Sequence, residues 1–160
     1  MKELEKLKKL NQKLEKLQDK ICLVQKNLNN VLMPKIELMR KIQLDIFEKN
    51  NKSGKISLPF GYVFNSKPSH IRHIPDNIDD FEIKSDMTIL HGKKYFSGCG
   101  DEYVSIQIPS EYLEMSLEEI KEDYTKRFQS EVDSIVKEEE DKILERKKQE
   151  FERLKKELEK

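Results

Sequence analysis

The chain has 160 residues, of which 39% are Asp, Glu, Lys or Arg and 36% are apolar. No window approaches the roughly 18 uninterrupted apolar residues that a membrane span requires, and the first 30 residues are charged throughout, unlike a secretory signal. We therefore expect a cytoplasmic protein with no membrane partner. The 31 basic and 31 acidic residues cancel, which argues against a dedicated polyanion binder.

The N-terminal segment carries a heptad seam, in which eight apolar residues follow one another at alternating spacings of three and four. The intervening residues are almost all Lys, Glu, Gln, Asn or Asp. A narrow apolar stripe on a solvated helix is typical of a coiled coil rather than of a helix buried in a globular core. We therefore predict that this seam mediates homo-oligomerisation. Its residues are Leu7, Leu10, Leu14, Leu17, Ile21, Val24, Leu28 and Val31.

Two long helices are expected, one at each end of the chain. The first spans residues 1–50, with a kink near Pro34, because proline removes a backbone donor and crowds the preceding turn. The second belongs to the segment 113–160, and its helix begins at Ser116, which forms a capping box with Glu119. Beyond Val136 its apolar stripe thins, so its far end is expected to be loosely held or to need a partner.

Residues 51–112 lie between the helices and are expected to form a β-rich head. Prolines, glycines, β-branched and aromatic residues gather here, and Val104, Ile106 and Ile108 alternate with polar residues as in a half-buried strand. A long loop is expected over residues 67–80 and a hairpin turn over residues 98–101. The predicted strands are residues 56–65, 81–83, 87–91, 94–97 and 103–108.

The predicted fold class is therefore α+β, with two long terminal coiled-coil helices flanking a small β-rich head. Each helix is roughly 70 Å long at 1.5 Å per residue. Residues 1–50 carry an excess of five basic side chains and residues 101–160 an excess of seven acidic ones. Similar lengths and opposite charges favour an antiparallel helical hairpin within one chain. The alternative uses the N-terminal heptads for a parallel homodimer.

This layout of two terminal helical arms around strands resembles that of the prefoldin chaperone subunits. The resemblance is one of architecture and carries no residue over to this chain. It implies oligomeric heads and apolar surfaces at the tips of the arms. A prefoldin-like holdase chaperone is accordingly one alternative function.

A second alternative is a single-stranded nucleic-acid-binding protein. Lysines in the head are interleaved with aromatic residues, and aromatic rings that stack on bases beside lysines that bind phosphates form a coherent platform. The competing interpretation is that the aromatic residues form the core of a small β domain. The lysines of this alternative are Lys52, Lys55, Lys67, Lys93 and Lys94.

The head also contains residue types that bind zinc, namely His70, His73, His91 and Cys99. The spacing of His91 and Cys99 differs from that of common zinc motifs, and no Cys-x-x-Cys pair accompanies them. We therefore expect ordinary loop and turn residues here, and no cofactor. Cys22 and Cys99 imply no disulfide framework.

The favoured function is a non-enzymatic, oligomeric coiled-coil binding or adaptor protein. Its head would recognise a partner protein, whose identity the sequence leaves open, while the helical arms set the oligomeric state. The small size and the lack of catalytic motifs would suit an accessory protein of a phage or another mobile element. The residues expected to contact the partner are Arg72, His73, Tyr95, Phe96, Cys99, Asp101 and Tyr103.

Overall fold

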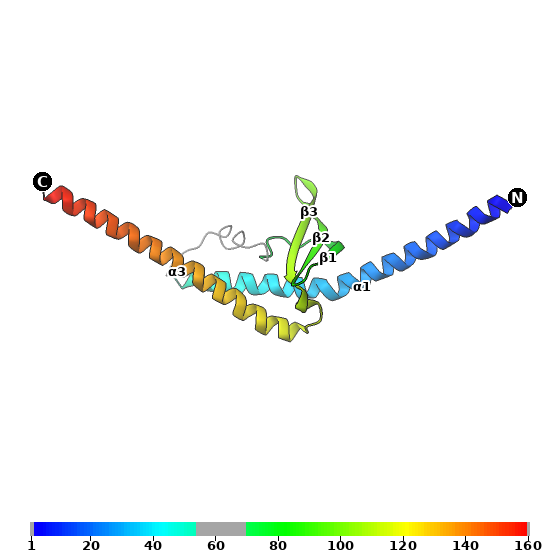
Figure 1. The fold of residues 1–160 in the computed structure, drawn as a ribbon, viewed down its shortest axis with the longest axis horizontal. Coiled ribbons are helices and arrows are strands. Elements are labelled where there is room, and N and C mark those ends of the chain that lie inside the picture. Colours follow the sequence, from blue (N-terminus) through cyan, green and yellow to red (C-terminus); the bar gives the residue numbers. More distant parts are fainter. Residues whose placement is uncertain (1, 54–69, 160) are drawn as a thin grey trace. The chain divides into compact units, whose positions relative to one another are not determined.

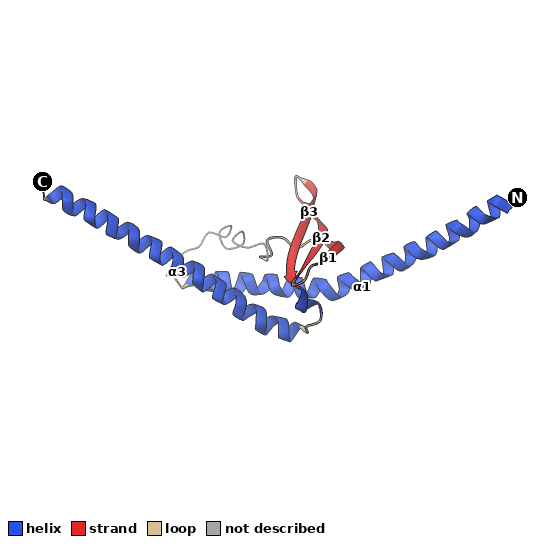
Figure 2. Cartoon of the chain, in the orientation of Figure 1, coloured by secondary structure: helices blue, strands red, loops and turns tan. Residues whose placement is uncertain are grey.

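The described part of the chain contains two long helices and, between them in the sequence, a three-stranded antiparallel sheet (Figure 1). The structure is a computed structural model that describes residues 2–53 and 70–159. This arrangement confirms the predicted α+β class, and Figure 2 shows the helices and strands in separate colours. The elements are α1 (Lys2–Lys52), β1 (Asn77–Ile83), β2 (Met87–Phe96), β3 (Gly100–Pro109), the short 3₁₀ helix η1 (Ser110–Leu113) and α3 (Leu117–Leu158).

The chain divides into two compact units, and α1 contributes to both. The sheet unit consists of Met1–Glu37 and His73–Glu114. The helical unit consists of Leu38–Arg72 and Met115–Lys160. Helix α1 runs through Pro34 without restarting and ends at Lys52. None of the helices among residues 2–53 and 70–159 is long and apolar enough to cross a membrane.

The predicted capping box at the start of α3 is confirmed. The hydroxyl of Ser116 accepts a hydrogen bond from the backbone N–H of Glu119 (3.3 Å). The Glu119 carboxylate in turn accepts one from the backbone N–H of Ser116 (2.8 Å). The hydrogen bond from the backbone N–H of Ser116, and then one from its side chain, favour the ionised carboxylate and so lower the pKa of Glu119. The helix therefore begins where its local sequence satisfies the unpaired backbone donors.

Helix α3 is buried only in its first half, where its buried residues recur every four positions. From residue 140 to residue 159 every side chain is exposed. In the helical unit, the part of α1 after Glu37 and helix α3 run in the same direction (Figure 1). The antiparallel helical hairpin expected from the sequence is therefore not confirmed. The buried residues of α3 are Ile120, Tyr124, Phe128 and Val132.

The strand order of the sheet is β1, β2, β3, and both pairs are antiparallel. Strand β2 is continuous, so the break predicted between residues 91 and 94 is wrong. Strand β1 begins at Asn77, so the predicted loop over residues 67–80 ends four residues too late. Its register with β2 shifts between Ile78 and Asp80, which interrupts the regular alternation of the sequence. The strand predicted over residues 56–65 lies outside the described residues.

Gly92 lies within β2, in the stretch where a break was predicted, and the chain around the start of β1 approaches it closely. A Cβ atom at this position would lie 2.0 Å from the backbone oxygen of Asn77 and 2.7 Å from the Cβ of Pro75. No side chain fits in that space, so the close approach of the segment before β1 requires glycine here. The predicted hairpin turn is found, as a three-residue connection between Phe96 and Gly100 in which Gly98 has φ = 92°.

The two faces of the sheet differ in burial. On one face, Thr88 and Leu90 of β2 are buried beside their cross-strand partners Ile108 and Ile106 of β3. The opposite face remains largely open, and Lys93, Tyr95 and Tyr103 are exposed on it. We call this surface the open face. It is defined by Asp80, Glu82, Ile89, His91, Lys93, Tyr95, Asp101, Tyr103, Ser105 and Gln107.

Helix α1 is attached by hydrogen bonds to β1, at one edge of the sheet, and to η1, which follows β3. At the β1 edge, the side-chain amide of Asn29 donates to the backbone oxygen of Ile78 (2.9 Å) and accepts from its N–H (2.7 Å). After β3, the ammonium group of Lys35 donates to the backbone oxygens of Tyr112 (2.9 Å) and Leu113 (2.8 Å). Burial lowers the pKa of Lys35. These two side chains fix the helix across the sheet.

We predict that Asn29→Ala destabilises the sheet unit, because it leaves two part-buried backbone groups of Ile78 without partners. The expected loss is about 1 to 3 kcal/mol in the free energy of unfolding. Chemical denaturation measures this loss, and amide hydrogen exchange at Ile78 locates it. The control Asn30→Ala changes the neighbouring exposed residue and should have little effect. Unchanged exchange at Ile78 in the Asn29→Ala variant would contradict the anchoring role.

Candidate functional site

The seam of α1 is exposed over most of its length. Six of its residues, from Leu7 to Val24, retain between 55% and 65% of their side-chain exposure, and Val31 retains 54%. Only Leu28 is half-buried. Large apolar residues at regular heptad positions are therefore left open along one line of a helix. Such a line indicates a surface that pairs with another helix.

The apolar side chains of the seam outweigh its flanking charges in energy. Full burial of a Leu, Ile or Val side chain contributes roughly 1.5 to 3 kcal/mol, and a side chain that is already half-covered gains about half of that. An exposed ion pair contributes only about 0 to 1 kcal/mol. The free energy of pairing therefore comes from the seam itself. The charges beside it act mainly on the choice and orientation of the partner.

The sheet does not cover the seam. Helix α1 contacts the sheet through Asn29, and Gln25 donates a long hydrogen bond (3.5 Å) to the backbone oxygen of Asp79. The seam residues Val24 and Val31 remain exposed in the same stretch of helix. Anchoring and the open seam thus use different positions of α1. The sheet unit can keep its contacts with the helix while the seam binds a partner.

The open face combines exposed aromatic rings with charges of both signs. Tyr103 is 77% exposed and Tyr95 is 62% exposed. The ammonium group of Lys93 lies 5.4 Å from the centre of the Tyr103 ring, close enough for a cation–π interaction. Across the hairpin, Tyr95 pairs with Asp101. Tyrosines accompanied by a few charges are common in surfaces that bind proteins.

The structure brings together only some of the residues expected to contact a partner. Tyr95, Asp101 and Tyr103 share the open face. Phe96 points to the opposite face, where its ring forms an edge contact with His73 at 5.1 Å. The other two residues are exposed at separate places: Cys99 in the hairpin turn and Arg72 in the helical unit.

The lysines expected to bind nucleic acid do not form a basic patch among the described residues. Lys93 is the one lysine of the open face, which also carries three carboxylates, Asp80, Glu82 and Asp101. Lys94 points to the other face. Lys52 lies at the end of α1 and pairs with a glutamate one turn earlier. Lys55 and Lys67 lie outside the described residues.

Lys94 is held by Asp76, a contact that the sequence did not suggest. One carboxylate oxygen of Asp76 accepts a hydrogen bond from the ammonium group of Lys94 (2.7 Å). The other accepts one from the backbone N–H of Tyr95 (3.0 Å). The hydrogen bond from Lys94 and then that from Tyr95 lower the pKa of Asp76. Because 18 residues separate Asp76 from Lys94, only the register of the sheet shows the pair.

The histidines have other contacts. His91 bonds the hydroxyl of Ser105 (2.8 Å), and Cys99 lies beyond the end of the same strand. His91 is five residues from the end of β2, a distance of roughly 17 Å along the strand, so it cannot share a metal ion with Cys99. In the part of the chain that the structure describes, no group of three or more His, Cys, Asp or Glu side chains is placed to hold a metal ion.

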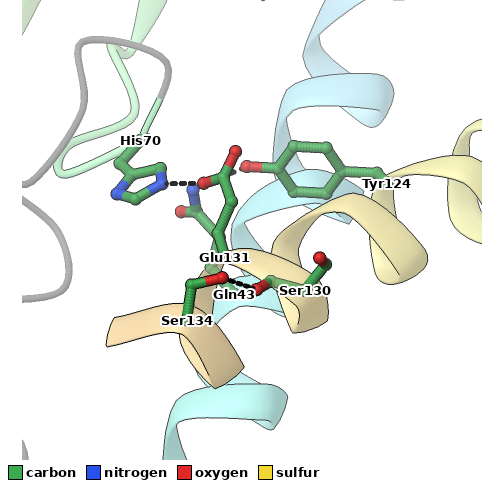
Figure 3. A network of polar contacts seen from close by, with 6 residues as sticks. All are labelled: Gln43, His70, Tyr124, Ser130, Glu131 and Ser134. Atoms are coloured by element: carbon green, nitrogen blue, oxygen red, sulfur yellow. Dashed lines mark hydrogen bonds and ion pairs between the residues drawn. The ribbon is translucent and has the colours of Figure 1, made fainter. Parts of the chain in front are cut away.

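A polar network lies inside the helical unit (Figure 3). The ring of His70 lies 2.6 Å from the carboxylate of Glu131 and makes an edge contact with Phe128. Gln43 and the hydroxyl of Tyr124 are 2.6 Å apart, and burial raises the pKa of that hydroxyl. With its amide turned to satisfy both its oxygen and its nitrogen, Gln43 also bonds the backbone N–H and oxygen of Ile71 (3.0 Å each). These contacts tie the segment at residues 70–71 to both helices.

Comparison with known proteins assigns no family to the chain. No protein-family model, curated protein or solved structure matched it. The resemblance to prefoldin subunits therefore stays an expectation drawn from the sequence. The function proposed below depends on the exposed side chains and charges of the described residues.

We predict that the Asp76 carboxyl group titrates below its ordinary value near 3.8. Because this pKa is lower in the folded than in the unfolded state, the ionised carboxylate stabilises the fold at pH values above the unfolded-state pKa. The stabilisation is lost as the pH falls through the folded-state pKa. Replacement of the donor in Lys94→Met should move the Asp76 pKa back towards 3.8. The carboxyl chemical shift of Asp76, followed by NMR as the pH is changed, measures its pKa in the wild type and in the variant. The control Lys93→Met removes a lysine that lies over Tyr103 instead, and should leave the Asp76 titration unchanged.

Proposed function

We propose that the protein is a non-enzymatic, oligomeric coiled-coil adaptor whose sheet unit binds a partner protein. The observation that carries this proposal is the exposed seam of α1. Six consecutive heptad positions, from Leu7 to Val24, are more than half exposed, and the residues between them are almost all charged or polar. A helix of this kind is stabilised by pairing with another apolar seam. The oligomer is the state in which these side chains leave water.

The open face supports a protein as the ligand of the sheet unit. Its exposed tyrosines provide large contact areas at a low cost in side-chain entropy. Its three carboxylates would repel a phosphate backbone, and Lys93 alone does not offset them. A protein partner of mixed charge suits this surface better than a nucleic acid does.

If the seam forms the oligomer, the mass of the protein in solution should depend on the seam residues. The wild-type chain should have a mass in solution that is a multiple of 19.1 kDa. The double variant Leu14→Glu with Leu17→Glu should be a monomer, because it places charges at two central seam positions. The control Leu23→Glu changes a leucine that is equally exposed, at 59%, but lies outside the seam. Light scattering coupled to size exclusion measures the mass, and a wild-type monomer at micromolar concentration would refute the proposal.

A labelled single-stranded oligonucleotide tests whether the sheet unit binds a protein or a nucleic acid. Fluorescence anisotropy at low salt should show no saturable binding by the wild-type protein. If the alternative were true, binding would be tight, would weaken steeply with salt, and would be reduced by Lys93→Glu combined with Lys94→Glu. The variant Lys84→Glu, which changes a lysine in the turn between β1 and β2, is the matched control.

A further inference from the structure

The two flanks of the seam differ in charge. In heptad notation, Leu7 takes position a and Leu10 takes position d, and the flanking positions g and e lie on opposite sides of the seam. Position g carries a lysine in three successive heptads, and position e carries a neutral amide in three. The lysines are Lys6, Lys13 and Lys20. The amides are Asn11, Gln18 and Gln25.

This asymmetry separates the two orientations of a pair of identical helices. In a parallel pair, position g of one helix faces position e of the other, so each lysine faces an amide. In an antiparallel pair, positions g face each other. If Leu7 of one copy lies opposite Val24 of the other, all the residues from Leu7 to Val24 are buried. In this antiparallel register, Lys13 faces Lys20 of the second copy. Facing like charges disfavour that arrangement, whereas the parallel pair contains no such repulsion.

We infer that the seam of α1 binds a second copy of this chain in parallel and in register. This inference rests on the proposed function and names the partner and the orientation of its coiled coil. In such a dimer both sheets lie at the same end of the coil, because each is bonded to its own α1 through Asn29, near the end of the seam. Two open faces are then presented side by side.

The exposed end of α3 is the other apolar stripe that could occupy the seam. It includes Leu144, Phe151 and Leu154, which are 45% to 66% exposed. However, Lys147 takes the heptad position between the first two of them, so this stripe is shorter and interrupted. Its glutamates at flanking positions, Glu150 among them, would attract the lysines of α1, but exposed ion pairs contribute little. The uninterrupted seam of a second α1 is the better match.

The orientation is tested by placing charges at position e with Asn11→Glu combined with Gln18→Glu. In the parallel dimer the new carboxylates face Lys6 and Lys13 of the other copy, which adds four ion pairs per dimer. The dissociation constant at low salt should fall about tenfold. In an antiparallel homodimer the new carboxylates would face one another, and the constant would rise, which would overturn the inference. The control Gln12→Glu with Lys16→Gln makes the same change in net charge at outward positions.

A cysteine at position d identifies the partner helix. The variant Leu17→Cys, combined with Cys22→Ser and Cys99→Ser, should form a disulfide-linked dimer on mild oxidation, because equivalent d positions meet in a parallel coil. The matched control Asp19→Cys places the thiol on the outer side of the helix and should not link. A dimer by mass without the Leu17→Cys link would refute the parallel seam but leave the proposed adaptor standing. A monomer at all concentrations would refute both.

Discussion

The fold depends on amide side chains of α1 that satisfy both backbone groups of a single isoleucine. Asn29 bonds the N–H and the carbonyl oxygen of Ile78 in the sheet unit. Gln43 bonds the same two groups of Ile71 in the helical unit. An edge strand or an irregular segment that approaches a helix buries backbone groups that have no regular partner, and each unpaired group costs about 1 to 3 kcal/mol. The amides remove that cost and hold each segment at one position along α1.

This way of attaching the chain leaves the seam of α1 uncovered. The polar contacts that hold the sheet come from Asn29, which bonds β1 off the line of the seam, and from Lys35, which bonds η1 and lies beyond Val31, the last residue of the seam. Burial of the seam by the sheet would have consumed the apolar surface that a second chain can use. The helix therefore serves two purposes at once. One set of its residues organises the sheet, and another remains free for assembly.

The features that the sequence predicts well are those set by local physics. Heptad spacing identified the seam, and the pair Ser116 and Glu119 identified the start of α3, because each depends on neighbours within a few residues. The anchoring amides could not be predicted, since an asparagine on a polar helix face gives no sign of a partner 49 residues away. The antiparallel direction expected from similar lengths and opposite charges is not confirmed, because those two properties fit helices that run in the same direction as well (Figure 1). The close approach of Asn77 and Pro75 to Gly92 could not be predicted either, because it depends on the pairing of β1 with β2.

A parallel coil would change what the sheet unit can bind. The open face alone offers two exposed tyrosines and a cation–π pair, a patch that is small for a stable complex. When two copies are held at the same end of a coil, binding by the second copy becomes intramolecular, and the overall affinity can exceed that of either face by orders of magnitude. Such a gain requires that both faces can bind at the same time; a parallel pair holds both sheets at one end of the coil, whereas an antiparallel pair holds them at opposite ends. The lysines that flank the seam thus connect a charge pattern on α1 to the strength with which the sheet unit can hold its partner.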